Sequence, residues 1–151
     1  MVTRRTFNLA AASLAGTSAL QACSSEANVS SYAQAVRDTW RHSTGVPGDA
    51  ALLRRELVRY ATLAPSSHNT QCWKFGIEPS AISILPDFSR RCPAVDPDDH
   101  HLFVSLGCAA ENLIQAALAN GLAGEASFDA ARSALRVALT PTQAIATPLF
   151  Q

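Results

Sequence analysis

The sequence carries little charge and no surplus of either sign. Of its 151 residues, 12 are Lys or Arg and 12 are Asp or Glu, so charged residues make up 16%. A balanced chain has no long-range attraction for nucleic acid or for an anionic membrane surface. Neither partner is therefore expected, although a local anion site needs only one or two arginines and a few backbone amides.

The four cysteines lack the spacing of the common metal and redox motifs. They stand at positions 23, 72, 92 and 108, and no pair has Cys-x-x-Cys spacing. A zinc knuckle or a thioredoxin-type site is therefore not expected. If Cys23 carries a lipid, three cysteines remain, and the sequence does not indicate which two would pair. Cys108 lies in an apolar helical pattern and is expected to be a small core residue.

The apolar run near the amino terminus is too short to span a membrane. Leu9–Leu20 falls below the roughly 20 residues of a transmembrane helix and has the length of a signal-peptide core. Arg4-Arg5 precedes it, as in twin-arginine export signals, and Leu20-Gln21-Ala22-Cys23 resembles a lipoprotein cleavage box. Residues 1–23 are therefore expected to be an export signal. The alternative is a fortuitous basic and apolar start.

This signal predicts how the chain is delivered. The twin-arginine export machinery is the expected partner, and the protein is expected in the periplasm or cell envelope. Cys23 is the candidate lipidation site, so the membrane is reached only through a lipid anchor.

Hydrophobic residues make up 48% of the chain, enough for one folded domain after the signal. Residues 24–31 are small and polar and are expected to be a tether. Residues 32–41 are expected to be helical, with Tyr32, Val36 and Trp40 on one face. Asp49 is a good N-cap for a second helix, which Pro65 stops near Leu63. Its predicted buried face consists of Leu52, Leu53, Leu57 and Tyr60.

The remaining pattern alternates between strands and one long helix. Residues 73–77 and 81–85 are expected to form a hairpin, and residues 125–128 and 134–139 two more strands. Between them a helix is expected over about residues 99–120, with Asp96, Asp98 and Asp99 at its start and Gly121 after its end. Its predicted buried residues are Leu102, Leu106, Ala109, Leu113, Ala116, Ala117 and Asn120. The fold class is therefore α+β, in a domain of residues 32–151.

Residues 64–73, between the second helix and the hairpin, hold the densest run of polar side chains. The run reads Ala-Pro-Ser-Ser-His-Asn-Thr-Gln-Cys-Trp. Short hydroxyl and amide side chains in a tight loop are suited to binding a polar small molecule, and they also suit an ordinary capping turn. Both interpretations stay open on the sequence alone.

This run resembles the flavin-binding loop of nitroreductase-like flavoproteins, in particular their exported branch. In that family the loop usually reads Asn-x-Gln-Pro-Trp, and here Cys72 replaces the proline. The resemblance continues with less specific matches and covers roughly residues 52–151. These matches are Asp87, Arg90, Arg91, Asp96-Pro97, Ser105-Leu106-Gly107 and Glu111-Asn112-Leu113.

The resemblance implies a sandwich of antiparallel sheet and helices that binds FMN between two subunits. Electrons would pass from NAD(P)H to a nitro-aromatic or quinone-like acceptor, and the long helix would form a homodimer interface. The cofactor-binding residues that it implies are Ser66, Ser67, Asn69 and Gln71, with His68 equally explained as a surface residue of the turn. Since flavin carries the electrons itself, no catalytic side chain is expected.

Members of that family continue for about as long again, so the chain is expected to hold the amino-terminal half of the domain. The alternative function is a non-catalytic flavin-binding or remnant lipoprotein. Candidate phosphate partners are Arg41, Arg59, Arg90 and Arg91, and the sequence does not choose among them. The adjacent His100 and His101 point to different sides of a helix, so no metal site is expected.

Overall fold

The computed structural model describes residues 26–43 and 47–150, which fall into two units, residues 1–41 and residues 42–151. The predicted export signal, its paired arginines and the lipidation candidate Cys23 lie outside the described residues.

Helix α2 (Glu26–Trp40) is the described part of the first unit. It begins at Glu26 rather than at Tyr32, so most of the predicted tether is helical. That polar segment contains neither Gly nor Pro, and the other residues differ by less than about 1 kcal/mol in helix propensity. The predicted apolar face is present and exposed, with Tyr32 73%, Val36 37% and Trp40 67% accessible.

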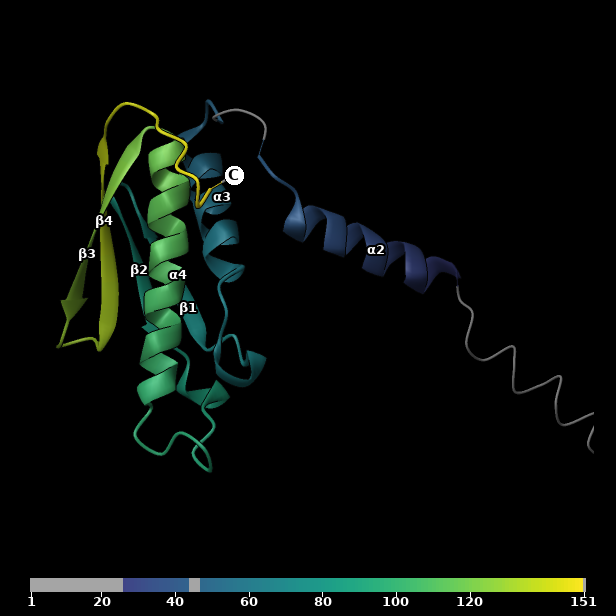
Figure 1. Cartoon of the computed structure of the whole chain (residues 1–151), viewed down its shortest axis with the longest axis vertical. Helices are drawn as coiled ribbons and strands as arrows, with labels where there is room; N and C mark the ends of the chain where they lie inside the picture. The colour runs from purple at the N-terminus through teal and green to yellow at the C-terminus, as the bar shows by residue number, and fades with distance from the viewer. Residues whose placement is uncertain (1–25, 44–46, 151) are drawn as a thin grey trace, which may run out of the picture. The chain divides into compact units, whose positions relative to one another are not determined.

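The second unit has two α-helices and four strands (Figure 1). In chain order its elements are α3 (Ala50–Thr62), η2 (Ser67–Asn69), β1 (Trp73–Glu78), β2 (Ala81–Pro86), η3 (Phe88–Arg90), α4 (His100–Ala119), β3 (Leu122–Asp129) and β4 (Ala134–Pro141). The strands form one antiparallel sheet in the order β1-β2-β4-β3. The α+β class is therefore confirmed.

The predicted hairpin forms, and the two further predicted strands are present, pair with each other and are longer than expected. β1 and β2 pair across Pro79-Ser80, whereas β3 begins at Leu122 rather than at Glu125. Gly121 adopts a left-handed φ of 76° and turns the chain directly from α4 into β3. Leu122 then packs against the core, which extends the strand toward the helix.

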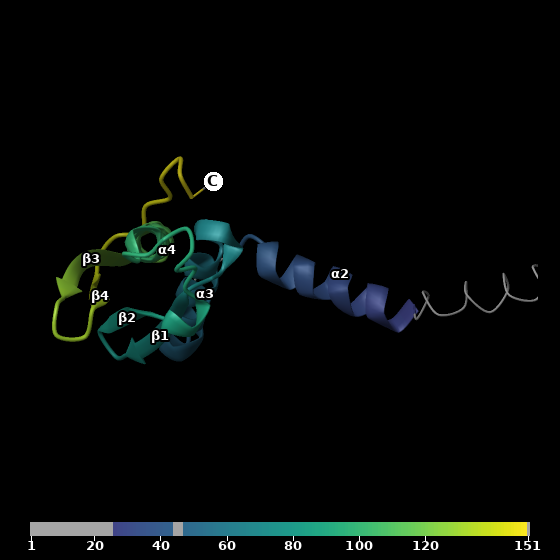
Figure 2. The same ribbon diagram turned by 90° about the horizontal axis from the view of Figure 1, so that it is seen from below.

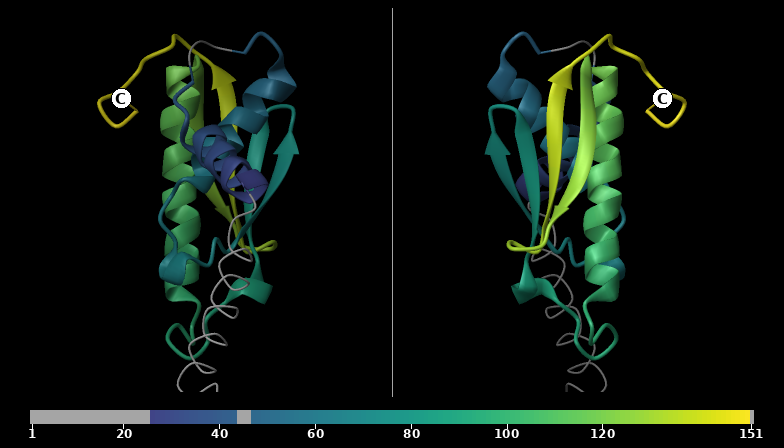
Figure 3. Two further views of the ribbon diagram at one scale, coloured as in Figure 1. Left: turned by 90° about the vertical axis from the view of Figure 1, so that its right-hand side faces the viewer. Right: turned by 90° about the vertical axis from the view of Figure 1, so that its left-hand side faces the viewer.

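Helices α3 and α4 cover one face of the sheet (Figure 2). Phe75 pairs with Ile84, and Ile82 pairs with Val137, so these apolar side chains share the face that joins the core. By the strand register, the other face carries mostly small and polar residues, among them Lys74, Ser83 and Arg136; its strands are in front in the right view of Figure 3. There Arg136 lies 3.4 Å from Glu78. This alternation is typical of an antiparallel sheet covered on one side.

Helix α3 begins as the sequence predicts, but one residue of its predicted buried face is wrong. Backbone N–H groups of Leu52 and Ala51 donate to the Asp49 carboxylate and lower its pKa. Leu53 and Leu57 are buried, whereas Leu52 is 59% exposed. Leu52 and Leu53 point about 100° apart on the helix, and it is Leu53 that faces the core.

Helix α4 is the central element of the core. All seven of its predicted buried residues are buried, and Cys108 is partly buried against them. On length and composition alone, α4 is also the one helix among residues 26–43 and 47–150 that is apolar enough to cross a membrane. Its packing against α3 and the sheet accounts for that composition without a membrane.

Candidate cofactor-binding loop

The candidate loop, residues 64–72, connects α3 to β1. Helix α3 ends at Thr62, with Leu63 at its C-cap, and Pro65 prevents the helical bonding from continuing. One short 3₁₀ turn, η2, follows before the chain enters β1. The five predicted cofactor-binding residues therefore lie together on a connection between two packed elements.

The backbone of this loop is held in an unusual conformation. His68, Asn69 and Gln71 have left-handed φ angles of 53°, 52° and 49°. A non-glycine residue rarely adopts this region, and asparagine and histidine tolerate it better than glutamine. Such strain persists where surrounding contacts fix the backbone, and it is common at binding sites.

Those contacts come first from the two serines. The Ser66 hydroxyl accepts from the Gln71 N–H at 2.9 Å, and the Ser66 carbonyl accepts from the Asn69 N–H at 2.9 Å. The Ser67 carbonyl accepts from the N–H and the hydroxyl of Thr70, at 3.1 and 3.0 Å. Both serines are partly buried and shape the loop, a role that the sequence does not reveal.

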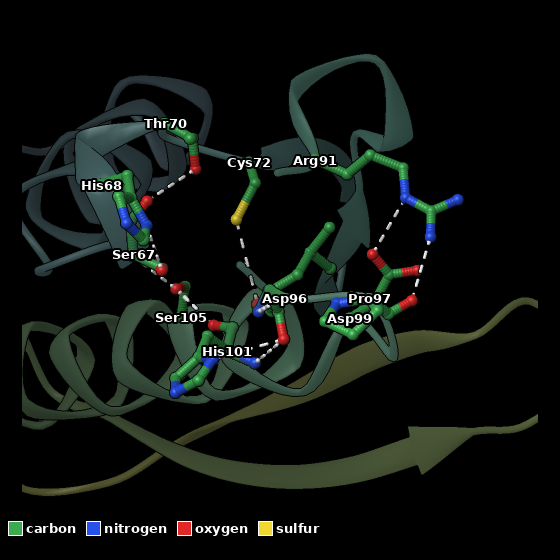
Figure 4. A network of polar contacts seen from close by, with 11 residues as sticks. Ser67, His68, Thr70, Cys72, Arg91, Asp96, Pro97, Asp99, His101 and Ser105 are labelled. Atoms are coloured by element: carbon green, nitrogen blue, oxygen red, sulfur yellow. Dashed lines mark hydrogen bonds and ion pairs between the residues drawn. The ribbon is translucent and has the colours of Figure 1, made fainter. Parts of the chain in front are cut away.

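The loop is also fixed to the first turns of α4 (Figure 4). The Ser67 N–H donates to the Ser105 hydroxyl at 3.1 Å, and that hydroxyl donates to the His101 carbonyl at 2.7 Å. Ser105 is 3% exposed. Its position on the buried face of an otherwise apolar helix is the one sequence signal that indicates this anchor.

Three predicted site residues remain exposed on the loop. His68, Asn69 and Gln71 all present their side chains to solvent. The Ser67 hydroxyl lies 2.9 Å from Nδ1 of His68, which orients the imidazole. The exposed rim of the loop therefore offers one imidazole and two amides, groups that both donate and accept hydrogen bonds.

A buried carboxylate caps α4 beneath the loop. The N–H groups of His101 and Leu102 donate to Asp96 at 3.1 and 3.0 Å, and Nδ1 of His101 lies 3.2 Å from it. Burial raises the pKa of Asp96, but these hydrogen bonds outweigh it and the net pKa is lowered. Asp99 occupies the N-cap position without a side-chain cap bond, so of the three predicted aspartates Asp96 does the capping.

The candidate arginines fall in different places. Arg90 donates from Nη1 to the Thr70 carbonyl at 3.1 Å and so touches the loop directly. Nε of Arg91 lies 3.1 Å from Asp99, and Arg59 binds Glu56 and lies over the ring of Tyr60. Arg41 belongs to the first unit. Arg90 is thus hydrogen-bonded to the candidate loop.

The space enclosed beside the loop is small. A cavity of about 10 Å³, room for roughly one water molecule, is bordered by Ser67, Thr70, Cys72, Arg90, Arg91, Cys92, Asp96 and Leu102. A wider, open hollow of about 400 Å³ lies elsewhere, between the start of α3 and the β1–β2 turn. The space beside the loop therefore has no room for a ring-sized ligand.

Within the described residues, no group of three His, Cys, Asp or Glu side chains is arranged to hold a metal ion. The rings of His100 and His101 meet edge to face, with centroids 5.5 Å apart.

Comparison with known proteins does not place the chain in a family. No family model matches it, and no curated protein matches it.

Proposed function

We propose that the second unit binds FMN on the exposed rim of the candidate loop. The observation that carries this proposal is the arrangement of His68, Asn69 and Gln71, three exposed side chains on a strained and internally hydrogen-bonded backbone. The edge of an isoalloxazine ring carries both hydrogen-bond donors and acceptors, and side-chain amides match both. A preformed loop binds without an ordering cost, which favours affinity.

The reaction proposed for this site is NAD(P)H-dependent reduction of a nitro-aromatic or quinone-like acceptor. Bound FMN supplies the hydride and electron transfer. The residues of the chain would hold and orient the ring, with Arg90 as the nearest cation for the phosphate. This activity and the nitroreductase-like sandwich together rest on the resemblance of residues 64–73.

In a homodimer, the second subunit would also contact the flavin ring. The outer face of α4 carries Val104, which is 51% exposed, and Gly107, where an added Cβ would meet nothing within 4 Å. This face lies on the same helix that anchors the loop through Ser105. We propose that two copies meet along it, and that residues 1–23 direct export by the twin-arginine route with Cys23 as the lipid attachment point.

FMN titration of the purified full chain tests the cofactor. The double variant Asn69→Ala and Gln71→Ala should raise the Kd for FMN roughly tenfold, since each lost hydrogen bond is worth about 0.5–1.5 kcal/mol. Gln143→Ala removes an equally exposed amide at the opposite end of α4 and should leave the Kd unchanged. Absence of FMN binding by the wild type, or equal losses in both variants, would remove the proposal.

A second candidate function is flavin binding without turnover. It is favoured by the hydrogen bonds within the loop, which already occupy the Ser66 hydroxyl and the Ser67 carbonyl. The cavity beside the loop is also too small for a substrate. Oxidation of NADPH in the presence of FMN and a nitro-aromatic acceptor separates the two functions. Turnover above that of free FMN supports the oxidoreductase, and bound FMN without turnover supports the non-catalytic protein.

A further inference from the structure

Two cysteines from separate segments border the same small cavity. Cys72, at the entrance to β1, is 1% exposed, and its Sγ lies 3.8 Å from the carbonyl of Leu102. Cys92 follows η3 and is partly exposed. Both are free thiols, and both line the cavity of about 10 Å³ beside the loop.

One backbone hydrogen bond and one side-chain hydrogen bond join these two segments. The N–H of Asp87 donates to the carbonyl of Cys72 at 2.9 Å, which fixes the start of the segment that leads to Cys92. Arg90, two residues before Cys92, binds the carbonyl of Thr70, two residues before Cys72. The turn of η3 between these anchors folds the segment back toward the loop.

The neighbouring turn also fixes Cys92. Its carbonyl accepts from the N–H groups of Val95 and Asp96, at 3.1 and 2.9 Å, so Cys92 stands at the start of a tight turn. Cys108, farther along α4, does not border the cavity. Of the three cysteines in the described residues, the structure therefore brings Cys72 and Cys92 to one place.

We propose that Cys72 and Cys92 form a reversible disulfide by exchange with a small disulfide oxidant such as oxidised glutathione. The partly exposed Cys92 loses its proton to solvent, and its thiolate attacks the oxidant. This step forms a mixed disulfide and releases one glutathione thiolate. The thiolate of Cys72 then attacks the sulfur of Cys92, closing the protein disulfide and releasing the second glutathione. Two protein thiols are oxidised and one glutathione disulfide is reduced.

This disulfide would fasten η3 to the base of the candidate loop. It would limit the distance by which Arg90 and the candidate loop can move apart. The small cavity that both cysteines border would close as the bond forms. The proposal does not depend on flavin binding, because its first readout is the bond itself. Formation requires that the two Cα atoms approach within about 7 Å.

Peptide mapping of the full chain tests the bond directly. After incubation with oxidised glutathione and alkylation, the protein is cut with trypsin and with a protease that cleaves before aspartate. The expected product joins residues 60–74 to residues 92–95, at the summed mass less two hydrogens. The cut before Asp96 separates Cys92 from Cys108, and Cys23 lies in another tryptic peptide, so the three possible partners of Cys72 are distinguished. Dithiothreitol should release the two peptides.

Matched variants complete the test. Cys108→Ser should keep the cross-link, and Cys92→Ser should abolish it. Oxidation should raise the thermal midpoint of the wild type and of Cys108→Ser by roughly 5–10 °C, and that of Cys92→Ser not at all. The proposal is overturned if Cys72 and Cys92 are both alkylated after oxidation, if the cross-link joins Cys108 instead, or if glutathione stays attached to Cys92.

Discussion

The two ends of α4 are built differently. At the carboxyl end the helix stops by an ordinary route, with Asn120 at the C-cap and Gly121 in the left-handed region. The returning chain then satisfies the free carbonyls. The N–H of Thr142 donates to Gly121 at 2.9 Å, and the N–H of Ile145 donates to Leu118 at 3.0 Å.

At the amino end the helix starts from a strained residue. Asp99 has a φ of 56° and no side-chain cap bond, and Asp96 caps the helix from three residues farther back. The candidate loop, η3 and the small cavity all lie at this end. A glycine at position 99 would adopt this conformation without strain.

The difference separates an end that serves folding from the end at which we propose that FMN binds. Of the five left-handed non-glycine residues in the described part of the chain, four lie on the loop or at this start of α4. The left-handed residue at the other end is a glycine, which adopts that conformation without strain. Backbone strain at positions where a glycine would remove it is a reason to look for a functional role there.

The largest expected effect comes from Gly121→Val at the folding end. Valine would be forced to a φ of 76°, and its Cβ would lie 3.3 Å from the Thr142 carbonyl. We expect a loss of about 2–3 kcal/mol in the free energy of unfolding, measured with urea.

The matched control is Gly107→Ala, in the middle of α4. An added Cβ there meets nothing within 4 Å, so the change should be neutral or stabilising by up to about 1 kcal/mol. Equal losses in the two variants would contradict the assigned role of Gly121. FMN affinity of the folded fraction should be unchanged in Gly121→Val.

A smaller effect is expected from Ser105→Ala at the binding end. The change removes the acceptor for the Ser67 N–H and should lower the free energy of unfolding by about 1 kcal/mol. Because the loop loses its anchor on α4, FMN affinity should fall as well. Ser127→Ala, an exposed serine on β3, is the control and should change both quantities little. Unchanged loop exchange by hydrogen–deuterium measurement in Ser105→Ala would argue against the anchor.

The helices and strands of the core could be predicted from the sequence, because their buried side chains recur with the period of a helix or a strand. The spacing of Leu102, Leu106 and Leu113 predicts the inner face of α4, and the alternation in β1 and β2 predicts the hairpin. Gly121 marks the helix end because few other residues tolerate its conformation. In these segments local preference and tertiary packing agree.

The contacts of the candidate site could not be predicted as well, because they join residues that lie far apart in the sequence. The run of polar side chains identifies the loop, but Ser105 and Arg90 reach it from 38 and 20 positions away. No local rule indicates that Asp96 rather than Asp98 or Asp99 caps α4, since the left-handed Asp99 redirects the chain. The pairing of Cys72 with Cys92 around one cavity likewise appears only in three dimensions.

A still smaller effect should appear as a pH dependence. Hydrogen bonds from the Ser89 hydroxyl and from Lys74 lower the pKa of Asp87 to about 2, from an ordinary value of 3.8. Because its folded pKa is depressed, this carboxylate stabilises the fold above about pH 4, and the contribution is lost as the pH falls toward about 2. Urea midpoints of the wild type and Asp87→Asn should differ at neutral pH and converge across that window. Glu125→Gln, an exposed control, should show no such convergence, and a gap that persisted at about pH 2 would contradict the assignment.

The smallest change in stability is expected from Arg90→Ala, which distinguishes the two ends most sharply. The Arg90 side chain is 53% exposed, so the loss of its bond to Thr70 should change the free energy of unfolding by no more than about 0.5 kcal/mol. FMN affinity should nevertheless fall severalfold, because the loop loses its contact with η3 and the site loses its nearest cation. Arg132→Ala, which replaces an exposed arginine in the turn between β3 and β4, is the matched control and should leave both quantities unchanged.

Gly121→Val would then lower stability without weakening binding, and Arg90→Ala would weaken binding without lowering stability. If Arg90→Ala instead lowered stability as much as Gly121→Val and left FMN affinity intact, both ends of α4 would serve folding alone.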